Sequence, residues 1–367
     1  MKLLVQPADG AAPLVRAINR ARQRVEVVIF RFDRSEIEKA LVNAVGRGVF
    51  VHALIAYTNR GGEKNLRKLE MRLLAQGVTV ARTADDLARY HGKMMIIDRR
   101  ELYVLAFNFT SLDLDHSRSF GLVTGHKKLV AEAVKLFEAD TRRQPYAAGQ
   151  PTFVVSPTNA RKQLAAFLQG AKKELLIYDP EVSDPAMIRI LEERAKAGVE
   201  IKIIGRLTRT STKLLVHKLA SMRLHTRTII RDGAQAFIGS QSLRELELNA
   251  RREVGLIFRD PKLVGQLMKI FTEDWEAVGR PASELADQLS VVEPATKVAK
   301  KVAKAVAKEL PPMAPVVEEV VNEMVGGKAG LDLDAQQVED AVKEAVRDAV
   351  QDVVEVVVAQ NGNGAHR

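Results

Sequence analysis

The amino-acid sequence predicts an α/β protein that is built from an internal duplication and followed by a helical tail. Three observations lead to this prediction. A strand–helix–strand pattern occurs twice along the 367 residues, each copy is followed by a similar histidine-containing tract, and the composition changes near residue 288. We therefore divide the chain into a first half (1–146), a second half (147–287) and a tail (288–367).

The first copy of the pattern lies in the first quarter of the chain. Residues 24–30 are rich in β-branched side chains, which is typical of a short buried strand. Residues 35–45 carry apolar side chains at helical spacing, and Ser35 suits a helix N-cap. Residues 48–55 begin with a glycine that suits the end of a helix and continue as a second strand.

The second copy repeats this order further along the chain. Residues 174–178 are typical of a strand, residues 184–197 of a helix, and residues 198–204 of a second strand. Strand–helix–strand units usually join parallel strands through right-handed crossovers. We therefore expect mixed, mostly parallel sheets in both halves.

The tail, residues 288–367, is dominated by Ala, Val, Lys and Glu. Two stretches within it, 297–308 and 335–358, have valine and alanine stripes at helical spacing, the first with a lysine face and the second with an acidic face. These patterns predict amphipathic helices that dock on the body or self-associate. Attachment to a membrane surface or to nucleic acid through the lysine face is the alternative.

Charge and composition restrict the classes of partner. The net charge is +10, but residues 291–367 carry 9 basic and 13 acidic side chains, so the rest of the chain is more basic still. Such a body favours polyanions, namely nucleic acid or anionic lipid. The absence of cysteine excludes disulfides and thiolate zinc sites. We find no signal peptide and no apolar stretch of membrane-spanning length, and we expect a cytoplasmic protein with peripheral membrane contact at most.

Two tracts in the sequence carry the chemistry. Each consists of a histidine, a cation two residues on and an aspartate seven residues on; the tracts are His91-x-Lys93-x4-Asp98 and His225-x-Arg227-x4-Asp232. On a strand, residues i and i+2 project from the same face, so each histidine and its cation should point at one object.

The similarity continues downstream at identical offsets. Residues 105–108 begin fourteen residues after the first histidine, and residues 239–242 begin fourteen after the second. The Arg-x-x-Gly segments 118–121 and 252–255 then each end thirty residues after their histidine. A single short motif arises easily by chance, but two copies with shared later landmarks do not.

With these motifs, the sequence resembles the phospholipase D superfamily, whose signature is His-x-Lys-x4-Asp followed by Gly-Ser/Gly-x-Asn, present twice in most members. The resemblance covers roughly residues 1–285. It implies a duplicated α-β-α sandwich whose two halves are related by a pseudo-twofold axis, with both motifs at the seam. It also implies that one histidine attacks phosphorus to give a phosphohistidine while the other protonates the leaving alkoxide.

The residue types suit this chemistry on physical grounds. Imidazole titrates near neutral pH, so two histidines can divide the nucleophile and acid roles. Cations and amide or hydroxyl donors stabilise the negative charge that gathers on the phosphate oxygens, so no metal or other cofactor is expected. The predicted catalytic residues are His91, His225, Lys93, Arg227, Asp98 and Asp232. The predicted phosphate-binding residues are Lys93, Arg227, Asn108, Ser240 and Ser242, with Glu253 and Gly239 in support.

Each half departs from the family pattern in a different place. Arg227 replaces the usual lysine, which keeps the charge and changes the donor geometry. The first half lacks the glycine and serine of the second motif, and the second half has Ser242 in place of asparagine. Only the second half has the downstream acid, Glu253, because Ser119 stands at the matching position.

Three functions agree with these observations. The first is hydrolysis or transfer of phosphatidyl groups, including cardiolipin-synthase-like chemistry on a phospholipid. The second is a nuclease or a nucleic-acid-end phosphodiesterase with the same site, although the 5% aromatic content offers little for stacking on bases. The third is a scaffold of weak or no activity that binds partners through its helical tail.

Overall fold

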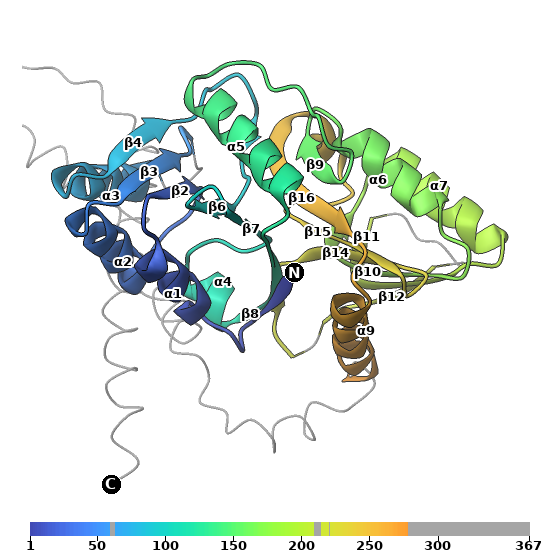
Figure 1. The fold of residues 1–367 in the computed structure, drawn as a ribbon. Coiled ribbons are helices and arrows are strands. Elements are labelled where there is room, and N and C mark those ends of the chain that lie inside the picture. The colour runs from blue at the N-terminus through green and yellow to red at the C-terminus, as the bar shows by residue number, and fades with distance from the viewer. Residues whose placement is uncertain (59–62, 209–213, 220, 278–367) are drawn as a thin grey trace, which may run out of the picture. The chain divides into compact units, whose positions relative to one another are not determined.

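The computed structural model describes residues 1–58, 63–208, 214–219 and 221–277 (Figure 1). The chain divides into two compact units, Met1–Gly279 and Arg280–Arg367. The predicted tail at 288–367, with its expected helices, lies outside the described residues. Within the described ranges, no helix is long and apolar enough to cross a membrane.

The elements of the two halves follow the same order. The first half contains β1 (Lys2–Gln6), α1 (Ala12–Arg20), β2 (Arg24–Ile29), α2 (Ser35–Gly46), β3 (Phe50–Ile55), α3 (Glu63–Ala75), β4 (Thr79–Arg82), β5 (Arg89–Tyr90), β6 (Met94–Ile97), β7 (Glu101–Leu105), α4 (Ser111–Asp115), β8 (Ser117–Thr124) and α5 (Lys127–Thr141). The second half contains β9 (Phe153–Ser156), α6 (Ala160–Gln169), β10 (Glu174–Val182), α7 (Pro185–Lys196), β11 (Glu200–Leu207), β12 (Leu215–His217), β13 (Arg223–Leu224), β14 (Arg227–Arg231), β15 (Gln235–Gly239), α8 (Glu245–Asn249), β16 (Arg251–Phe258) and α9 (Pro261–Glu276).

All six elements expected from the strand–helix–strand pattern are present, as β2, α2, β3, β10, α7 and β11. Their ends differ slightly from expectation. Ser35 is the first residue of α2 and Arg34 occupies the N-cap, so the predicted capping role of Ser35 is wrong. Asp184 does cap α7, because its carboxylate accepts from the backbone N–H groups of Ala186 and Met187.

The two sheets have the same strand order. The first runs β1-β8-β7-β6-β2-β3-β4, and the second runs β12-β11-β10-β14-β15-β16 with β9 at its end. The sheets are mixed, but the expectation that they are mostly parallel is wrong. Eight of the fourteen strand pairings that the structure describes are antiparallel. The strand–helix–strand units give parallel pairs, whereas the histidine tracts fold back as hairpins and meanders.

Two short strands are exchanged between the halves. The first-half strand β5 pairs with β16 of the second half, and the second-half strand β13 pairs with β8 of the first. Both pairings are parallel and two residues long. Each of these strands leads directly into a histidine tract, so each tract enters its sheet from the edge of the other half.

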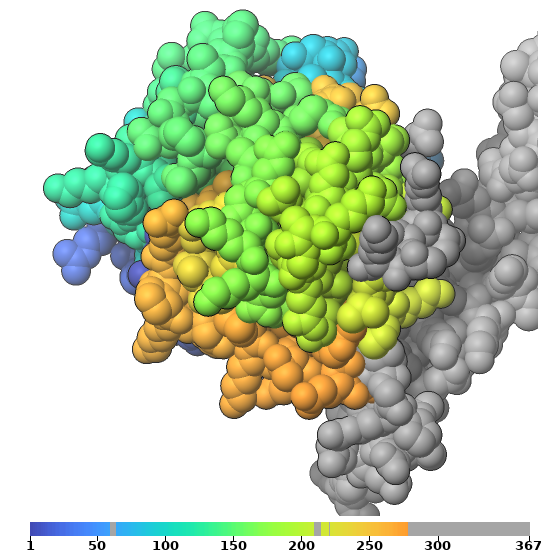
Figure 2. Space-filling view, turned by 90° about the vertical axis from the view of Figure 1, so that its right-hand side faces the viewer, coloured from blue at the N-terminus to red at the C-terminus, as the bar shows by residue number. Residues whose placement is uncertain are grey.

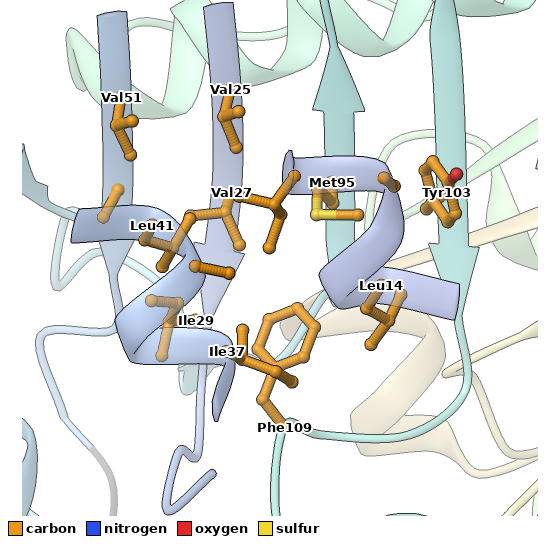
Figure 3. Close-up of a cluster of buried hydrophobic side chains, with 14 of the residues drawn as sticks. Leu14, Val25, Val27, Ile29, Ile37, Leu41, Val51, Met95, Tyr103 and Phe109 are labelled. Carbon is orange, nitrogen blue, oxygen red and sulfur yellow. The ribbon is translucent and has the colours of Figure 1, made fainter. Parts of the chain in front are cut away.

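Helices and sheets alternate in layers, as the duplicated sandwich requires. On the outer face of the first sheet, α1, α2 and α3 bury a cluster that includes Leu14, Val27 and Leu41 (Figure 3). On the outer face of the second sheet, α6 and α7 bury a corresponding cluster. Figure 2 shows these two helices, in yellow-green, above α9 in orange. The inner faces of both sheets share one core with α5 and α9. Each fully buried aliphatic side chain contributes roughly 1.5–3 kcal/mol.

Two buried ion pairs join the halves at corresponding positions. Arg118 on β8 donates from Nε and Nη2 to the two carboxylate oxygens of Asp274 on α9, both at 2.8 Å. Arg252 on β16 lies 3.1 Å from Asp140 on α5. Both arginines directly precede the positions Ser119 and Glu253. The last strand of each half is therefore tied to the last helix of the other half, and the seam between the halves is fixed where the histidines lie.

Candidate functional site

The structure brings the two histidine tracts together at the seam. The backbone N–H of His91 donates to the carbonyl oxygen of Arg252 at 2.8 Å, and the N–H of His225 donates to the carbonyl of Arg118 at 3.1 Å. Each histidine is thus anchored to the last strand of the opposite half. Both side chains are buried, with 7% of each residue exposed.

His91 is held by groups from both halves. Its Nδ1 lies 2.8 Å from Oε2 and 3.0 Å from Oε1 of Glu253, a fully buried carboxylate on β16. The ring of Phe30 packs edge-on against the imidazole, with 4.5 Å between centroids. A carboxylate at Nδ1 places the ring proton on that nitrogen, so Nε2 carries the lone pair of the neutral imidazole.

Lys93 lies beside the same imidazole and is 1% exposed. Its Nζ is 3.0 Å from Nε2 of His91 and donates to the carbonyl oxygen of that residue at 2.8 Å. The strand rule that predicted a histidine and its cation on one face is therefore obeyed in the first tract.

The second tract has a different set of partners. Nδ1 of His225 lies 3.2 Å from Oδ2 of Asp113 without the alignment of a hydrogen bond. Arg227 donates from Nε to Oγ of Ser242 at 3.1 Å and from Nη1 to the carbonyl of His225 at 3.2 Å. Its Nε is 4.0 Å from the carboxylate of Glu247. Ser242 and Glu247 therefore hold the arginine in addition to the carbonyl of its histidine.

Burial and like charges shift the titration of the site. The pKa of His91 is lowered well below the usual value by desolvation, then by the charges of Lys93 and Arg227. The pKa of His225 is lowered in the same way by desolvation, Arg227 and Arg223, with further contributions from Lys93 and His91. These shifts favour neutral imidazoles at pH 7. These mutual effects across the seam also show that the two tracts share one electrostatic environment.

The pKa of Lys93 is lowered to about 7, first by desolvation and then by Arg227, although Glu253 opposes the shift. The pKa of Glu253 is raised by its complete burial, against the pull of Lys93. An anionic phosphate that enters the site would favour the charged form of Lys93 and raise its pKa again.

The remaining predicted phosphate ligands differ in how far they are available. Asn108 is buried, and its Nδ2 donates to Asp113 at 2.7 Å while its Oδ1 has no partner. Ser240 is engaged with Val254, whose N–H donates to its Oγ at 3.1 Å. A Cβ atom on Gly239 would lie 2.8 Å from Cα of Gly255, so glycine is required there for two strands to approach closely.

Asp98 and Asp232 do not reach the site, and their predicted catalytic role is wrong in this structure. Each follows a strand, β6 or β14, at the end remote from the histidine, with φ of 51° and 55°. Asp98 accepts backbone N–H groups of residues 22–24, and Asp232 accepts those of residues 172–174. At about 3.3 Å per residue, Asp98 lies about 16 Å along the strand from Lys93. Both carboxylates fix a turn.

Sequence reasoning missed the acids of α4 and α8. Asp113 and Glu247 both follow their histidine by twenty-two residues. Each accepts the backbone N–H of the phosphate-ligand position, Asn108 or Ser242, at 2.7 Å. A comparison of residues 109–117 with residues 243–251 at the same offset would have found this pair. It would not have found Asp179, a fully buried acid on β10 that receives the N–H of Leu243, because no acid occupies the matching place on β2.

The seam thus holds two buried imidazoles, a lysine, an arginine and an asparagine, together with the acids Glu253, Asp113 and Glu247. Neutral imidazoles act as nucleophiles at phosphorus, and cations stabilise a phosphate in its transition state. Within the part of the chain that the structure describes, no group of three or more His, Cys, Asp or Glu side chains is arranged to hold a metal ion.

Comparisons with known proteins agree with this arrangement. The family described as "Cardiolipin synthase, PLD-like domain" matches residues 14–141 and 164–275. The chain is 27% identical over 225 residues to polyphosphate kinase 1 of Chlorobaculum tepidum. That match covers 56% of this chain and 32% of the relative, so the chain spans about a third of the length of that protein.

Two solved structures share the fold. The polyphosphate kinase of Porphyromonas gingivalis has a TM-score of 0.63 and 21% identity, over 74% of this chain and 49% of the other. The phosphatidylserine synthase of Haemophilus influenzae Rd KW20 has a TM-score of 0.58 and 11% identity, over 76% of this chain and 86% of the other. At these identities the similarity concerns the fold alone, which is that of the phospholipase D superfamily.

Proposed function

The chain belongs to the cardiolipin synthase family of phospholipase D-like domains, and on this premise we propose that it hydrolyses or transfers phosphatidyl groups through a phosphohistidine intermediate. The observation that carries the proposal is the pair of buried imidazoles contributed by the two halves. One of them, His91, has a buried carboxylate on Nδ1. This arrangement leaves Nε2 of His91 as the attacking atom.

In the first step, Nε2 of His91 attacks phosphorus and the bond from phosphorus to the leaving alkoxide breaks. His225 gives a proton to that alkoxide, so the alcohol leaves in neutral form and His225 becomes neutral. Desolvation and the neighbouring cations keep the pKa of His225 low. We therefore infer that His225 takes up its proton when the anionic substrate binds, because the negative charge of the substrate favours imidazolium.

In the second step, neutral His225 removes a proton from water or from an acceptor alcohol. The resulting nucleophile attacks the phosphohistidine, the P–N bond breaks, and His91 is restored with its lone pair on Nε2. The two histidines therefore exchange acid and base roles between steps, and no proton is gained or lost over the cycle when an alcohol is transferred.

Lys93 and Arg227 stabilise the non-bridging oxygens in both steps. Each cation lies two residues after its histidine and within hydrogen-bonding distance of that residue's backbone carbonyl. One preorganised donor in a site that excludes water lowers the activation barrier by roughly 3–4 kcal/mol. Asn108 is buried, and its Nδ2, which donates to Asp113, would add a neutral donor.

A phospholipid is the substrate class that the family supports best, since its name refers to cardiolipin synthase and one structural relative is a phosphatidylserine synthase. A second candidate is phosphoryl transfer with polyphosphate, because the curated relative and the structure with the higher TM-score are polyphosphate kinases. A nucleic-acid phosphodiester is the third, and the basic body favours it.

The test is a side-by-side assay of the purified chain. The substrates are vesicles of labelled phosphatidylglycerol with glycerol as acceptor, polyphosphate with a nucleoside diphosphate, single-stranded DNA and RNA, each with and without chelator. The double variant His91→Ala/His225→Ala is the control. We expect release or transfer from the lipid that survives chelation and is absent from the control.

Activity confined to polyphosphate or to nucleic acid would replace the lipid assignment by the second or third candidate. Activity that persists in the double variant would show that the histidines are not the site. Loss of activity on chelation, with recovery on adding a divalent ion, would contradict the metal-independent mechanism.

A further inference from the structure

The two histidines differ in what supports Nδ1. Glu253 supports His91, but the residue at the matching position of the first half is Ser119. The hydroxyl of Ser119 is fully buried and reaches only the carbonyl oxygen of His225, at 3.5 Å. His225 is therefore without the acid that its counterpart has, and its Nδ1 is a buried polar atom that lacks a hydrogen-bond partner.

A different carboxylate lies within reach of this atom. Oδ2 of Asp113 is 3.2 Å from Nδ1 of His225, and the residue is 2% exposed. Asp113 belongs to α4 of the first half, so it approaches His225 across the seam, as Glu253 approaches His91. A small rotation of the imidazole or of the carboxylate would align this contact as a hydrogen bond.

The position of Asp113 is fixed from several sides. Its Oδ2 accepts the backbone N–H and the Nδ2 of Asn108, both at 2.7 Å. Its Oδ1 accepts Nη1 of Arg223 at 2.6 Å, and Arg223 lies two residues before His225. One carboxylate thus connects the asparagine of the first half with the histidine tract of the second. A group held this firmly can orient an imidazole without moving.

We propose that Asp113 is the positioning residue of His225, accepting a hydrogen bond from Nδ1–H and so replacing the acid that is absent at position 119. It then fixes the tautomer in which Nε2 of His225 faces the substrate, and it stabilises the imidazolium that donates a proton to the leaving group. This inference rests on the proposed function, because it specifies how the second histidine acts as acid and base.

The alternative is that Asp113 only braces the loop of Asn108. The corresponding acid of the second half, Glu247, has that bracing contact with Ser242 and pairs with Arg251. The two roles differ in their consequence for titration. Desolvation lowers the pKa of His225 most, and the charges of Arg227, Arg223 and Lys93 lower it further. A carboxylate 3.2 Å from Nδ1 favours the charged imidazole, so removal of the Asp113 carboxylate should lower the pKa of His225 further.

The first experiment needs no substrate. The full chain is labelled with ¹⁵N-histidine, and the ring nitrogens of His225 are assigned by their loss in His225→Gln. In the unmodified protein we expect Nδ1 to carry the proton and Nε2 to be bare. In Asp113→Asn we expect this preference to be lost and the titration of His225 to move to lower pH. The matched control is Asp115→Asn, on the same helix but 40% exposed and paired with Arg34.

The second experiment measures turnover of a bis-aryl phosphodiester across pH. We expect Asp113→Asn to lower kcat about 100-fold, with KM changed less than about threefold, and Asp113→Glu to recover part of the loss. The pH-rate limb that requires protonated His225 should move to lower pH in Asp113→Asn and stay in place in Asp115→Asn.

The two experiments separate the possible failures. If the unmodified protein has the proton of His225 on Nε2, or if Asp113→Asn leaves its titration unchanged, the positioning role is wrong whatever the activity. The reading on the unmodified protein holds even if Asp113→Asn fails to fold. If the ring-nitrogen shifts agree with the proposal but no phosphodiester is turned over, then the proposed function fails while the contact stands.

Discussion

The two halves share one fold but differ at the residues where they meet. In the first half, a lysine bonded to the carbonyl oxygen of His91 and an asparagine accompany this histidine, whose acid comes from the opposite half. In the second half, an arginine bonded to Ser242 accompanies His225, which has only a serine at the matching position. The duplication thus fixes where the groups stand, and the side chains differ enough for the two histidines to take separate roles. A symmetric scaffold can therefore support asymmetric chemistry.

The largest expected effect is loss of either histidine. His91→Ala and His225→Ala should each lower turnover of a bis-aryl phosphodiester by about 10⁴-fold or more, because the two groups act in one reaction. The double variant should lose little beyond either single variant. Quenched time courses measure these rates. The labelled phosphohistidine should accumulate in His225→Ala if this variant slows the second step more than the first. Multiplicative losses would show two independent sites.

The cations provide the next comparison. Lys93→Ala should lower kcat about 10²–10³-fold, because it removes a buried positive charge that stabilises the negative charge on the phosphate oxygens in the transition state. Arg227→Lys should stay within about tenfold of the unmodified protein, since it keeps the charge and restores the residue of the family pattern. Steady-state kinetics of the two variants decides the point. If Lys93→Ala kept kcat while Arg227→Lys lost it, then Arg227 rather than Lys93 would be the cation on which turnover depends.

Substitution at Glu253 should lower kcat more than substitution at Ser119, the matching position of the first half. Glu253→Gln should lower kcat about 10–100-fold, because the hydrogen bond that orients His91 is weakened. Ser119→Ala, at the matching position, should change kcat less than about threefold, since its hydroxyl reaches only a carbonyl oxygen. Equal losses at the two positions would mean that both serve packing rather than the imidazoles.

Proton uptake on anion binding should distinguish the two cations further. Desolvation lowers the pKa of Lys93 to about 7, so a fraction of this side chain is neutral at pH 7. A bound oxyanion such as tungstate favours the charged form, so binding should take up protons near pH 7 and weaken as pH rises above 7. Titration calorimetry in buffers of different ionisation enthalpy measures the uptake. Lys93→Met should reduce the uptake to the part that His225 contributes.

The smallest effect on turnover is expected from the turn aspartates. Asp98→Ala and Asp232→Ala each remove an acceptor of several backbone N–H groups, at a cost of about 1–3 kcal/mol in unfolding free energy. Because both carboxylates lie away from the histidines, kcat of the folded fraction should change less than about threefold. Denaturant unfolding and kinetics on the same samples test this. A large loss of kcat without loss of stability would return these residues to the catalytic set.

Apolar patterns and matched offsets predicted the repeated strand–helix–strand frame, because these are local signals. The meeting of the two tracts at the seam was implied by the resemblance to the phospholipase D superfamily. The sequence did not predict the contacts of site residues that depend on parts of the chain far apart in sequence. Position seven of the motif looked catalytic, but Asp98 lies at the wrong end of a strand. The contact of Asp113 with His225 depends on how the two halves meet, and the contact of Asp179 with Leu243 depends on a loop 64 residues away, so neither follows from local patterns. The sheets were expected to be mostly parallel because the hairpins that follow the histidines were not counted.

The exchanged strands β5 and β13 have a consequence for how the protein is made. The first half leaves the ribosome with His91 already in place, but the strand that receives β5 and the carboxylate of Glu253 are translated 162 residues later. A nascent first half can therefore complete its own sheet and still lack an oriented nucleophile. Under the proposed mechanism, a half-made chain would therefore be unable to cleave a phosphodiester until the second half has been translated and has docked.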